Sequence, residues 1–194
     1  MSAPGRPAHH GDLTAVRAAA WAMLAEGARD PGSPCRHVTV ATIAEDGAPT
    51  LRTVVLRGAD PAAQTLRFHT DTRSHKYAEL QRDPRAELHA YDRAAKVQIR
   101  ARGTVALHTA DATTAALWAQ TPEPGKSAYR QPVAPGAPLA TPGGAEGPLL
   151  SDEAGYRHFV AAILHVDALE WLYLADGGHR RARLTRHGDA WLAP

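Results

Sequence analysis

The residues with the clearest capacity for chemistry lie in one short stretch of the chain. An apolar run has an arginine at each end, Arg52-Thr-Val-Val-Leu-Arg57, and a second run ends at Phe68-His69-Thr70-Asp71. The segment Thr72-Arg73-Ser74-His75-Lys76 follows, where a helix is expected to start. Free backbone amides at a helix N-terminus favour an anion, and hydroxyl and basic side chains add charge-assisted hydrogen bonds. This pattern predicts either a phosphate-binding turn or a solvated turn that carries surface bases.

The elements that would position this stretch alternate between two periodicities. Asp12 can cap a helix over residues 13–26, whose apolar residues recur at helical spacing. From His37 the period changes to two, and Asp46-Gly47 separates the first two strands as a hairpin turn. A bend is expected at Gly103. The predicted strands are 37–43, 50–57, 64–70, 86–91, 96–107, 164–175, 181–186 and a short one at Trp191; the other predicted helices are 74–82, 111–120 and 151–162.

The sum of these elements predicts a mainly β protein with peripheral helices, in which antiparallel strands form a small closed barrel. Residues 1–194 are expected to be a single domain, because no linker separates two folded parts. Residues 1–11 lack periodicity and are expected to be a flexible arm. Residues 121–150 contain 12 Pro or Gly in 30 positions, which predicts a long loop without a core element.

Composition narrows the function classes. The chain has 194 residues, 44% of them apolar, and a net charge of +2, which is too small to indicate nucleic-acid binding. No apolar stretch is long enough to span a membrane, and the N-terminus lacks the apolar core of a secretory signal. Cys35 is the sole cysteine, with no paired His and acid, and no histidine spacing supports a metal site. A cytoplasmic protein with a small-molecule substrate and no metal is expected.

Four segments in order resemble the FMN-binding split-barrel proteins related to pyridoxamine 5'-phosphate oxidase. They are Arg52-Thr-Val-Val-Leu-Arg57, Phe68 to Lys76, Val97-Gln98-Ile-Arg-Ala-Arg-Gly103, and the tail Trp171-Leu-Tyr-Leu-Ala-Asp-Gly-Gly-His179-Arg-Arg-Ala-Arg183. The resemblance implies an antiparallel split β-barrel that binds FMN, and a homodimer with FMN at the subunit interface. The residues that it implies for FMN binding are Arg52, Thr53, Val54, Val55, Leu56, Arg57, His69, Thr70, Ser74, His75, Lys76, Gln98, Tyr173 and Arg183.

Each of these residues also has a plainer interpretation. Val54, Val55 and Leu56 would belong to the core of any barrel, and Gln98 without the resemblance is better interpreted as an ordinary residue on a strand surface. His69 and His75 would be solvated side chains, while Trp118 and Trp171 are expected in the core.

The resemblance weakens where a substrate would bind. The family's biosynthetic oxidase holds its substrate's phosphate with a mid-chain loop and an Arg-x-His tail, and this chain lacks the Arg-x-His order. Lys126, Ser127, Tyr129, Arg130 and Arg181 are the candidate substrate-binding residues. No catalytic residue is assigned, and it is left open whether residues 121–150 close over the flavin.

Three functions follow from the resemblance. The first is an FMN-dependent oxidase of pyridoxamine or pyridoxine 5'-phosphate, in which a hydride passes to the flavin and O2 reoxidises it. The second is an FMN- or deazaflavin-dependent reductase of another substrate. The third is a non-catalytic flavin-binding protein.

Overall fold

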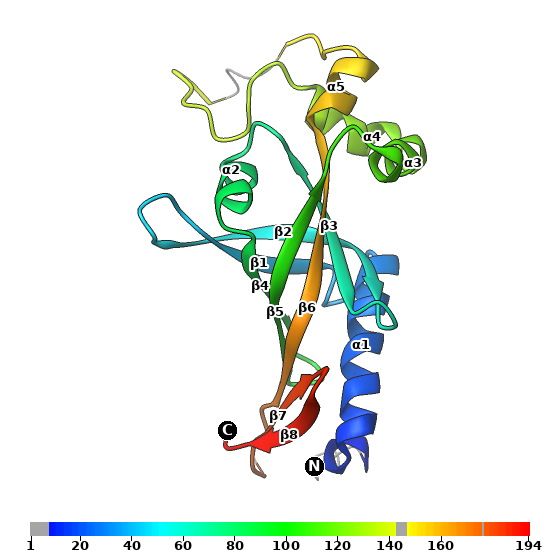
Figure 1. Cartoon of the computed structure of the whole chain (residues 1–194). Coiled ribbons are helices and arrows are strands. Elements are labelled where there is room, and N and C mark those ends of the chain that lie inside the picture. The colour runs from blue at the N-terminus through cyan, green and yellow to red at the C-terminus, as the bar shows by residue number, and fades with distance from the viewer. Residues whose placement is uncertain (1–7, 143–146, 176) are drawn as a thin grey trace.

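The computed structural model describes residues 8–142, 147–175 and 177–194 (Figure 1). Within them, the strands are β1 His37–Ile43, β2 Pro49–Asp60, β3 Thr65–Asp71, β4 Arg85–Asp92, β5 Val97–His108, β6 Phe159–Tyr173, β7 Arg180–Thr185 and β8 Gly188–Leu192. The α-helices are α1 Leu13–Arg29, α2 His75–Arg82, α3 Ala112–Gln120, α4 Glu123–Lys126 and α5 Asp152–His158. Two 3-10 helices, η1 Ala8–Gly11 and η2 Ser127–Arg130, complete the set.

The sheet closes on itself and then continues past the closure. Its strand order is β3-β2-β1-β4-β5-β6-β7-β8, all neighbours are antiparallel, and β3 also pairs with β6. The long strand β6 makes this possible, because its first half pairs with β3 and its second half pairs with β7. Six strands therefore form a barrel, and the β7–β8 hairpin extends from one side of it. The predicted antiparallel split barrel with peripheral helices is confirmed.

A bulge in β6 lies between the part of this strand that pairs with β3 and the part that pairs with β7. The β5–β6 register shifts between Arg102 and Gly103. A Cβ atom at Gly103 would lie 1.8 Å from the carbonyl oxygen of His165, so only glycine permits this approach of the two backbones. This register shift lies at the position of the predicted bend, Gly103.

The first half of β6 was predicted wrongly as the end of a helix. Helix α5 ends at His158, and the strand begins at Phe159, five residues before the predicted start. Phe159, Val160, Ala161 and Ala162 are all buried, so this part of the strand shows no alternation of apolar and polar residues. A buried run rich in alanine cannot be told from a helix by periodicity.

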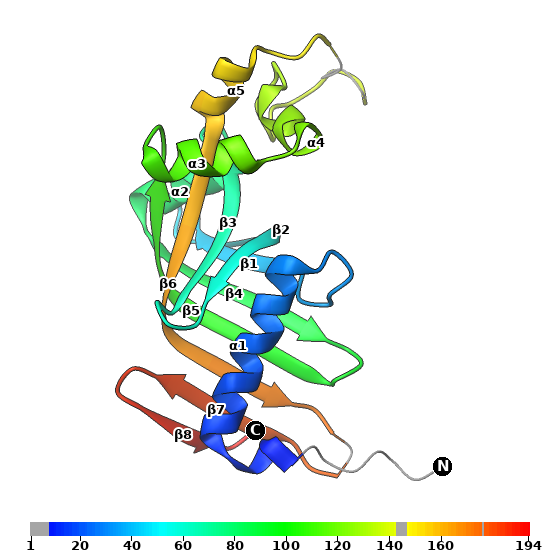
Figure 2. The same cartoon turned by 90° about the vertical axis from the view of Figure 1, so that its right-hand side faces the viewer.

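The N-terminal helix packs along the outside of the barrel (Figure 2). The Asp12 side chain caps α1 by accepting a hydrogen bond of 2.7 Å from the amide of Ala15. Its buried face includes Val16, Trp21 and Leu24, and the helix continues three residues beyond its predicted end. Residues 1–7 of the predicted arm lie outside the described residues. Residues 8–11 form η1 instead, and the buried His10 ring lies 4.8 Å from the Trp171 ring.

Helices α3, α4 and α5 gather at one end of the molecule, and the β7–β8 hairpin lies at the other (Figures 1 and 2). The described part of the 121–150 segment forms no strand, but it contains the two short helices α4 and η2, where the sequence predicted a loop throughout. Arg73 ties this segment to the barrel, because its guanidinium pairs with Asp71 and donates a hydrogen bond of 2.7 Å to the carbonyl of Gln131.

Candidate FMN site and its neighbouring cavity

The predicted phosphate-binding turn forms a compact polar corner at the start of α2. Ser74 is the N-cap residue of α2, yet its side chain makes no capping hydrogen bond. Its hydroxyl lies 3.0 Å from that of Thr70, and the ammonium of Lys76 donates to the same Thr70 hydroxyl at 3.2 Å. We call Arg52, Thr70, Ser74 and Lys76 the α2 corner.

Arg52 reaches the α2 corner from β2 and is held there by a buried carboxylate. Its guanidinium donates to Glu79 at 2.7 Å and to the Thr50 hydroxyl at 2.9 Å. Burial favours a raised pKa for Glu79, but hydrogen bonds from Thr42, Arg52 and Thr50 outweigh burial and lower that pKa. Glu79 is therefore ionised at neutral pH and fixes the direction of Arg52.

The electrostatics of the α2 corner suit a phosphate. Burial lowers the pKa of Lys76, and the nearby positive charge of Arg52 lowers it further. Glu79 balances one of the two positive charges. An anion placed between Arg52 and Lys76 would balance the other charge and relieve this repulsion. The first amides of α2 point out of the helix at the same place, so donors and charge coincide.

Two basic residues of the predicted turn do not join the α2 corner. Arg73 is committed to Asp71 and the 121–150 segment, as described above. His75 is exposed on α2, and Gly136 of the same segment lies beside its ring.

A cavity of about 370 Å³ lies beyond β2 and β3, under the segment that joins α3 to η2. Its polar lining comes from Arg57 in the second half of β2, Arg67 and His69 on β3, and Arg36 before β1. Leu117 of α3 and Tyr129 of η2 line it from the other side. Of the residues predicted for the flavin or the substrate, this cavity brings together Arg57, His69 and Tyr129.

Burial shifts the pKa values of two groups of the cavity, His69 and Tyr129, towards their neutral forms. Burial lowers the pKa of His69 to about 3, with smaller contributions from the charges of Arg67 and Arg57. Burial raises the pKa of Tyr129 to about 12. At neutral pH the imidazole is therefore uncharged and the phenol protonated, so both groups can form hydrogen bonds, and neither carries a charge.

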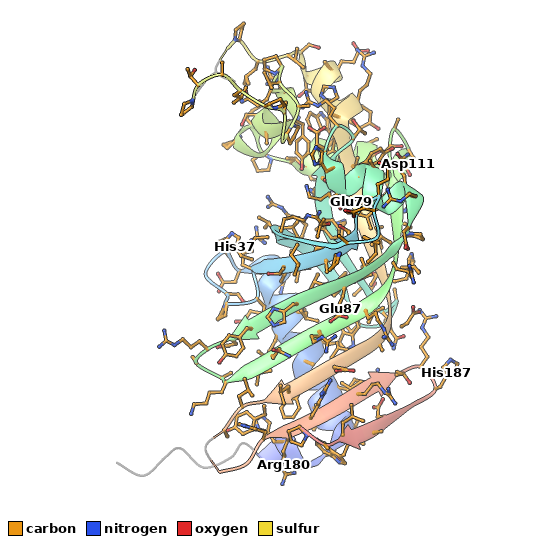
Figure 3. All side chains as sticks on the ribbon, turned by 90° about the vertical axis from the view of Figure 1, so that its left-hand side faces the viewer. His37, Glu79, Glu87, Asp111, Arg180 and His187 are labelled. Carbon is orange, nitrogen blue, oxygen red and sulfur yellow. The ribbon has the colours of Figure 1, made fainter. Side chains whose placement is uncertain are left out.

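The remaining predicted flavin residues of β2 divide between its two faces. Val54 and Leu56 are buried in the core, whereas Thr53 and Val55 point outward. Strand pairing places the outward side chains of β2, β1, β4, β5 and β7 on one continuous surface, which we call the open face. Figure 3 looks onto this face, where Glu87 is labelled.

Gln98 and Arg183 lie on the open face, away from the cavity lining. Tyr173 lies on the opposite side of the sheet, with its ring 4.3 Å from the His10 ring, because side chains alternate along β6. Leu172, one residue earlier, occupies the open-face position beside Gln98. The structure of one chain therefore does not bring Gln98, Tyr173 and Arg183 together with the α2 corner.

Most of the predicted substrate-binding residues have partners of their own. Lys126 lies 3.5 Å from Asp152 and over the Trp118 ring, and Arg130 pairs with Glu123 at 3.1 Å. The Ser127 hydroxyl donates to the carbonyl of Pro124. Arg181 pairs with Glu170 on the open face, so Tyr129 alone of this group lines the cavity.

Sequence reasoning missed Arg36 and Arg67. Arg67 stands two residues before His69, so the period of a strand places both on one face, and this signal was available. Arg36 lies in the loop before β1, where no pattern fixes a side-chain direction.

The fold is a split β-barrel, and its α2 corner gathers cations and hydroxyl groups whose chemistry suits a phosphate. Residues 18–109 match the family model described as "Pyridoxamine 5'-phosphate oxidase, FMN-binding domain", and they include β1 to β5 and the whole α2 corner. This segment, just under half of the chain, is therefore similar to the FMN-binding domain of the pyridoxamine 5'-phosphate oxidase family.

Curated relatives agree with this assignment over part of their length. A pyridoxine/pyridoxamine 5'-phosphate oxidase of Caulobacter vibrioides is 38% identical over 90 residues, which is 44% of this chain and 39% of that protein. The Azorhizobium caulinodans oxidase of the same name is 35% identical over 124 residues, or 61% of this chain and 56% of that protein. The chain thus spans about half the length of the curated relatives that it matches, or less.

Solved structures share the fold over the whole chain. A pyridoxamine 5'-phosphate oxidase-related, FMN-binding protein of Nostoc punctiforme has a TM-score of 0.72 at 24% identity, covering 98% of this chain and 100% of that one. PhzG of Burkholderia lata, in complex with tetrahydrophenazine-1-carboxylic acid, has a TM-score of 0.74 at 19% identity and covers both chains fully, 100% of each.

Two further observations concern the described residues alone. None of their helices is long and apolar enough to cross a membrane. In the same residues no group of three or more His, Cys, Asp or Glu is arranged to hold a metal ion.

Proposed function

We propose that the protein is an FMN-dependent oxidoreductase of the pyridoxamine 5'-phosphate oxidase type, which takes a hydride from a small molecule and uses O2 as the acceptor. The observation that carries this proposal is the cavity over β2 and β3. Arg57 and His69, both implied in FMN binding, line the cavity, so a small molecule there would be next to the flavin. A cavity of this size in contact with a cofactor site is more than flavin storage requires.

The α2 corner would hold the cofactor phosphate. Lys76 and Arg52 would supply the charges, with hydrogen bonds from Ser74, Thr70 and the first amides of α2. Bound FMN would supply a hydride acceptor that O2 can reoxidise. The protein needs no charged acid or base for this chemistry, and the neutral His69 and protonated Tyr129 agree with that requirement.

We further propose that the protein works as a homodimer that pairs through the open face. Leu51 is 66% exposed and Tyr91 is 43% exposed on this face, where they would supply apolar area to an interface. In such a dimer, Gln98 and Arg183 of one chain would be available to the flavin of its partner. This arrangement would explain why one chain does not bring all of the implied flavin residues together.

The primary test is the visible spectrum of the purified protein, followed by an FMN titration of the flavin-free form. Lys76→Gln is expected to weaken FMN binding at least tenfold, because a hydrogen bond between charged groups contributes about 1.5–3 kcal/mol. Lys96→Gln, at an exposed lysine in the β4–β5 turn, is the control and should bind FMN like the wild type. Failure to bind FMN, or equal affinity of Lys76→Gln and wild type, would contradict the assignment of the corner.

Activity assays then separate the candidate reactions. An oxidase should produce hydrogen peroxide from a reduced substrate, with pyridoxamine 5'-phosphate as the first compound to test. A reductase would instead need a reduced cofactor as electron donor and would produce no peroxide from that substrate. A protein that binds FMN and turns over neither kind of substrate would be a flavin carrier.

A further inference from the structure

Arg73 joins the predicted phosphate-binding turn to the 121–150 segment. Its Nε and Nη2 atoms donate to the two carboxylate oxygens of Asp71 at 3.0 and 2.8 Å, and its Nη1 donates to the carbonyl of Gln131 at 2.7 Å. Nη2 also lies 3.5 Å from the carbonyl oxygen of Tyr129. The planar guanidinium therefore holds together two parts of the chain that are 58 residues apart in the sequence.

Asp71 takes part both in this connection and in the α2 corner. Its backbone carbonyl accepts hydrogen bonds from the amide of Ser74 at 3.0 Å and from the Ser74 hydroxyl at 2.7 Å. Its carboxylate accepts a further hydrogen bond of 2.8 Å from the backbone amide of Arg73. Asp71 is buried and the Arg73 side chain is only 18% exposed, so water competes weakly for these bonds. A displacement of Ser74 would therefore displace the guanidinium of Arg73 as well.

The far end of the connection carries Tyr129, which lines the cavity. The Tyr129 carbonyl accepts a hydrogen bond of 2.9 Å from Nδ1 of His158, and its ring centroid lies 5.1 Å from that of Phe159 and 5.9 Å from that of Trp118. The carbonyl of His158 accepts a hydrogen bond of 2.9 Å from the amide of Thr72. This second connection does not involve the Arg73 side chain, so variants of Arg73 should keep the fold.

We propose that Arg73 is a positioning residue that couples the α2 corner to the cavity. A phosphate group bound at Ser74 would fix the turn at residues 71–74, and Arg73 would then hold the segment of Tyr129 and Gln131 in place. The inference rests on the proposed function, because it takes the cofactor phosphate to bind at the α2 corner. Hydrogen-bond networks of this kind can carry coupling between two sites, and the coupling acts in both directions, so an ordered cavity wall also favours retention of FMN.

The test is hydrogen–deuterium exchange of the full chain, followed by mass spectrometry, with and without FMN. The backbone amides of α4 and η2 are expected to exchange about fivefold more slowly, or slower still, in the FMN-loaded wild type, since coupling between two sites commonly amounts to about 5–150-fold. Arg73→Gln should remove most of this protection. The FMN affinity of Arg73→Gln should fall by no more than the lost protection factor, because the cavity wall contributes only the coupling to FMN binding. Undiminished protection in Arg73→Gln would overturn the proposal.

A second variant separates the charge of Arg73 from its geometry. The ammonium of Arg73→Lys can pair with Asp71, but it lacks the planar fork that reaches Asp71 and Gln131 at once, so this variant should also lose most of the protection. If lysine restores full protection, a positive charge is sufficient and the positioning role is wrong. Arg157→Gln is the control, because Arg157 is 67% exposed on α5 and pairs with Glu153 of the same helix, and it should keep the protection of the wild type.

Inorganic phosphate separates this inference from the proposed function, because it can occupy the α2 corner without a flavin. Exchange is therefore also measured on the flavin-free protein with and without phosphate. Bound FMN without slower exchange in α4 and η2 would refute the coupling alone. If the chain takes up no FMN, but phosphate protects α4 and η2 in the wild type and not in Arg73→Gln, the oxidoreductase is refuted and the coupling stands.

Discussion

At the scale of single residues, the cavity keeps His69 uncharged, and this has a consequence for stability. The folded-state pKa of about 3 lies well below the ordinary value of 6.5, so the unfolded chain binds the proton more readily. Stability should therefore fall as the pH drops from about 6.5 towards 3, by at most about 1.4 kcal/mol per pH unit from this group.

His69→Phe removes the titrating group and keeps a ring against Phe159, whose centroid lies 4.7 Å from that of His69. Between pH 7 and pH 5 the wild type is expected to lose about 1 to 2 kcal/mol more stability than this variant. Urea unfolding at both pH values measures the difference, and His165→Phe at an exposed position of β6 is the control. If wild type and His69→Phe lose stability in parallel, the buried neutral imidazole is contradicted.

Individual residues also show what sequence reasoning can find in a site. Ser74 and Lys76 of the α2 corner were predicted because their hydroxyl and ammonium groups stand close together in the chain at a helix start, whereas Arg52 and Thr70 come from strands. The cavity was not predicted, because its cations come from a loop and two strands that only the barrel brings together. Lys126 and Arg130 have the right chemistry in the sequence, but acids nearby in space take up their charges.

At the scale of elements, the register shift between β5 and β6 allows β6 to pair with β3 in its first half and with β7 in its second half. A methyl group at position 103 would collide with the backbone of β6, which cannot move without loss of the pairing to β3 or β7. Gly103→Ala should therefore destabilise the fold by about 3 kcal/mol or more, seen in chemical unfolding. Gly147→Ala, where an added Cβ meets nothing within 4 Å, is the control and should change stability by less than about 1 kcal/mol. Similar stabilities of the two variants would contradict this role of the bulge.

The strands differ in how far the sequence determines them. Residues 37–43 alternate between apolar core positions and half-exposed ones, and the predicted limits of β1 match the structure. The start of β6 is buried on both faces, between β3, β5 and the ring of Trp118, so its alternation disappears. Tertiary packing is what makes these residues a strand, and a single sequence does not carry that information.

At the scale of the whole molecule, the open face is the surface through which dimer assembly and FMN binding would depend on each other. It carries apolar side chains such as Leu51 beside an ion-pair network of Arg100, Glu170 and Arg181. A mixed surface of this kind suits an interface between two copies, in which apolar residues supply affinity and charges fix the register.

Leu51→Arg places a charge in the apolar part of this proposed interface. The dimer dissociation constant should rise at least tenfold in analytical ultracentrifugation, because the added charge would lose water without gaining a partner. Leu149→Arg is the matched control, since Leu149 is 41% exposed but lies in the 121–150 segment rather than on the sheet. Because Gln98 and Arg183 would reach the flavin only across the interface, FMN affinity should fall together with dimerisation in Leu51→Arg. A variant that becomes monomeric and still binds FMN like the wild type would show that one chain holds the cofactor by itself, and the shared site would have to be abandoned.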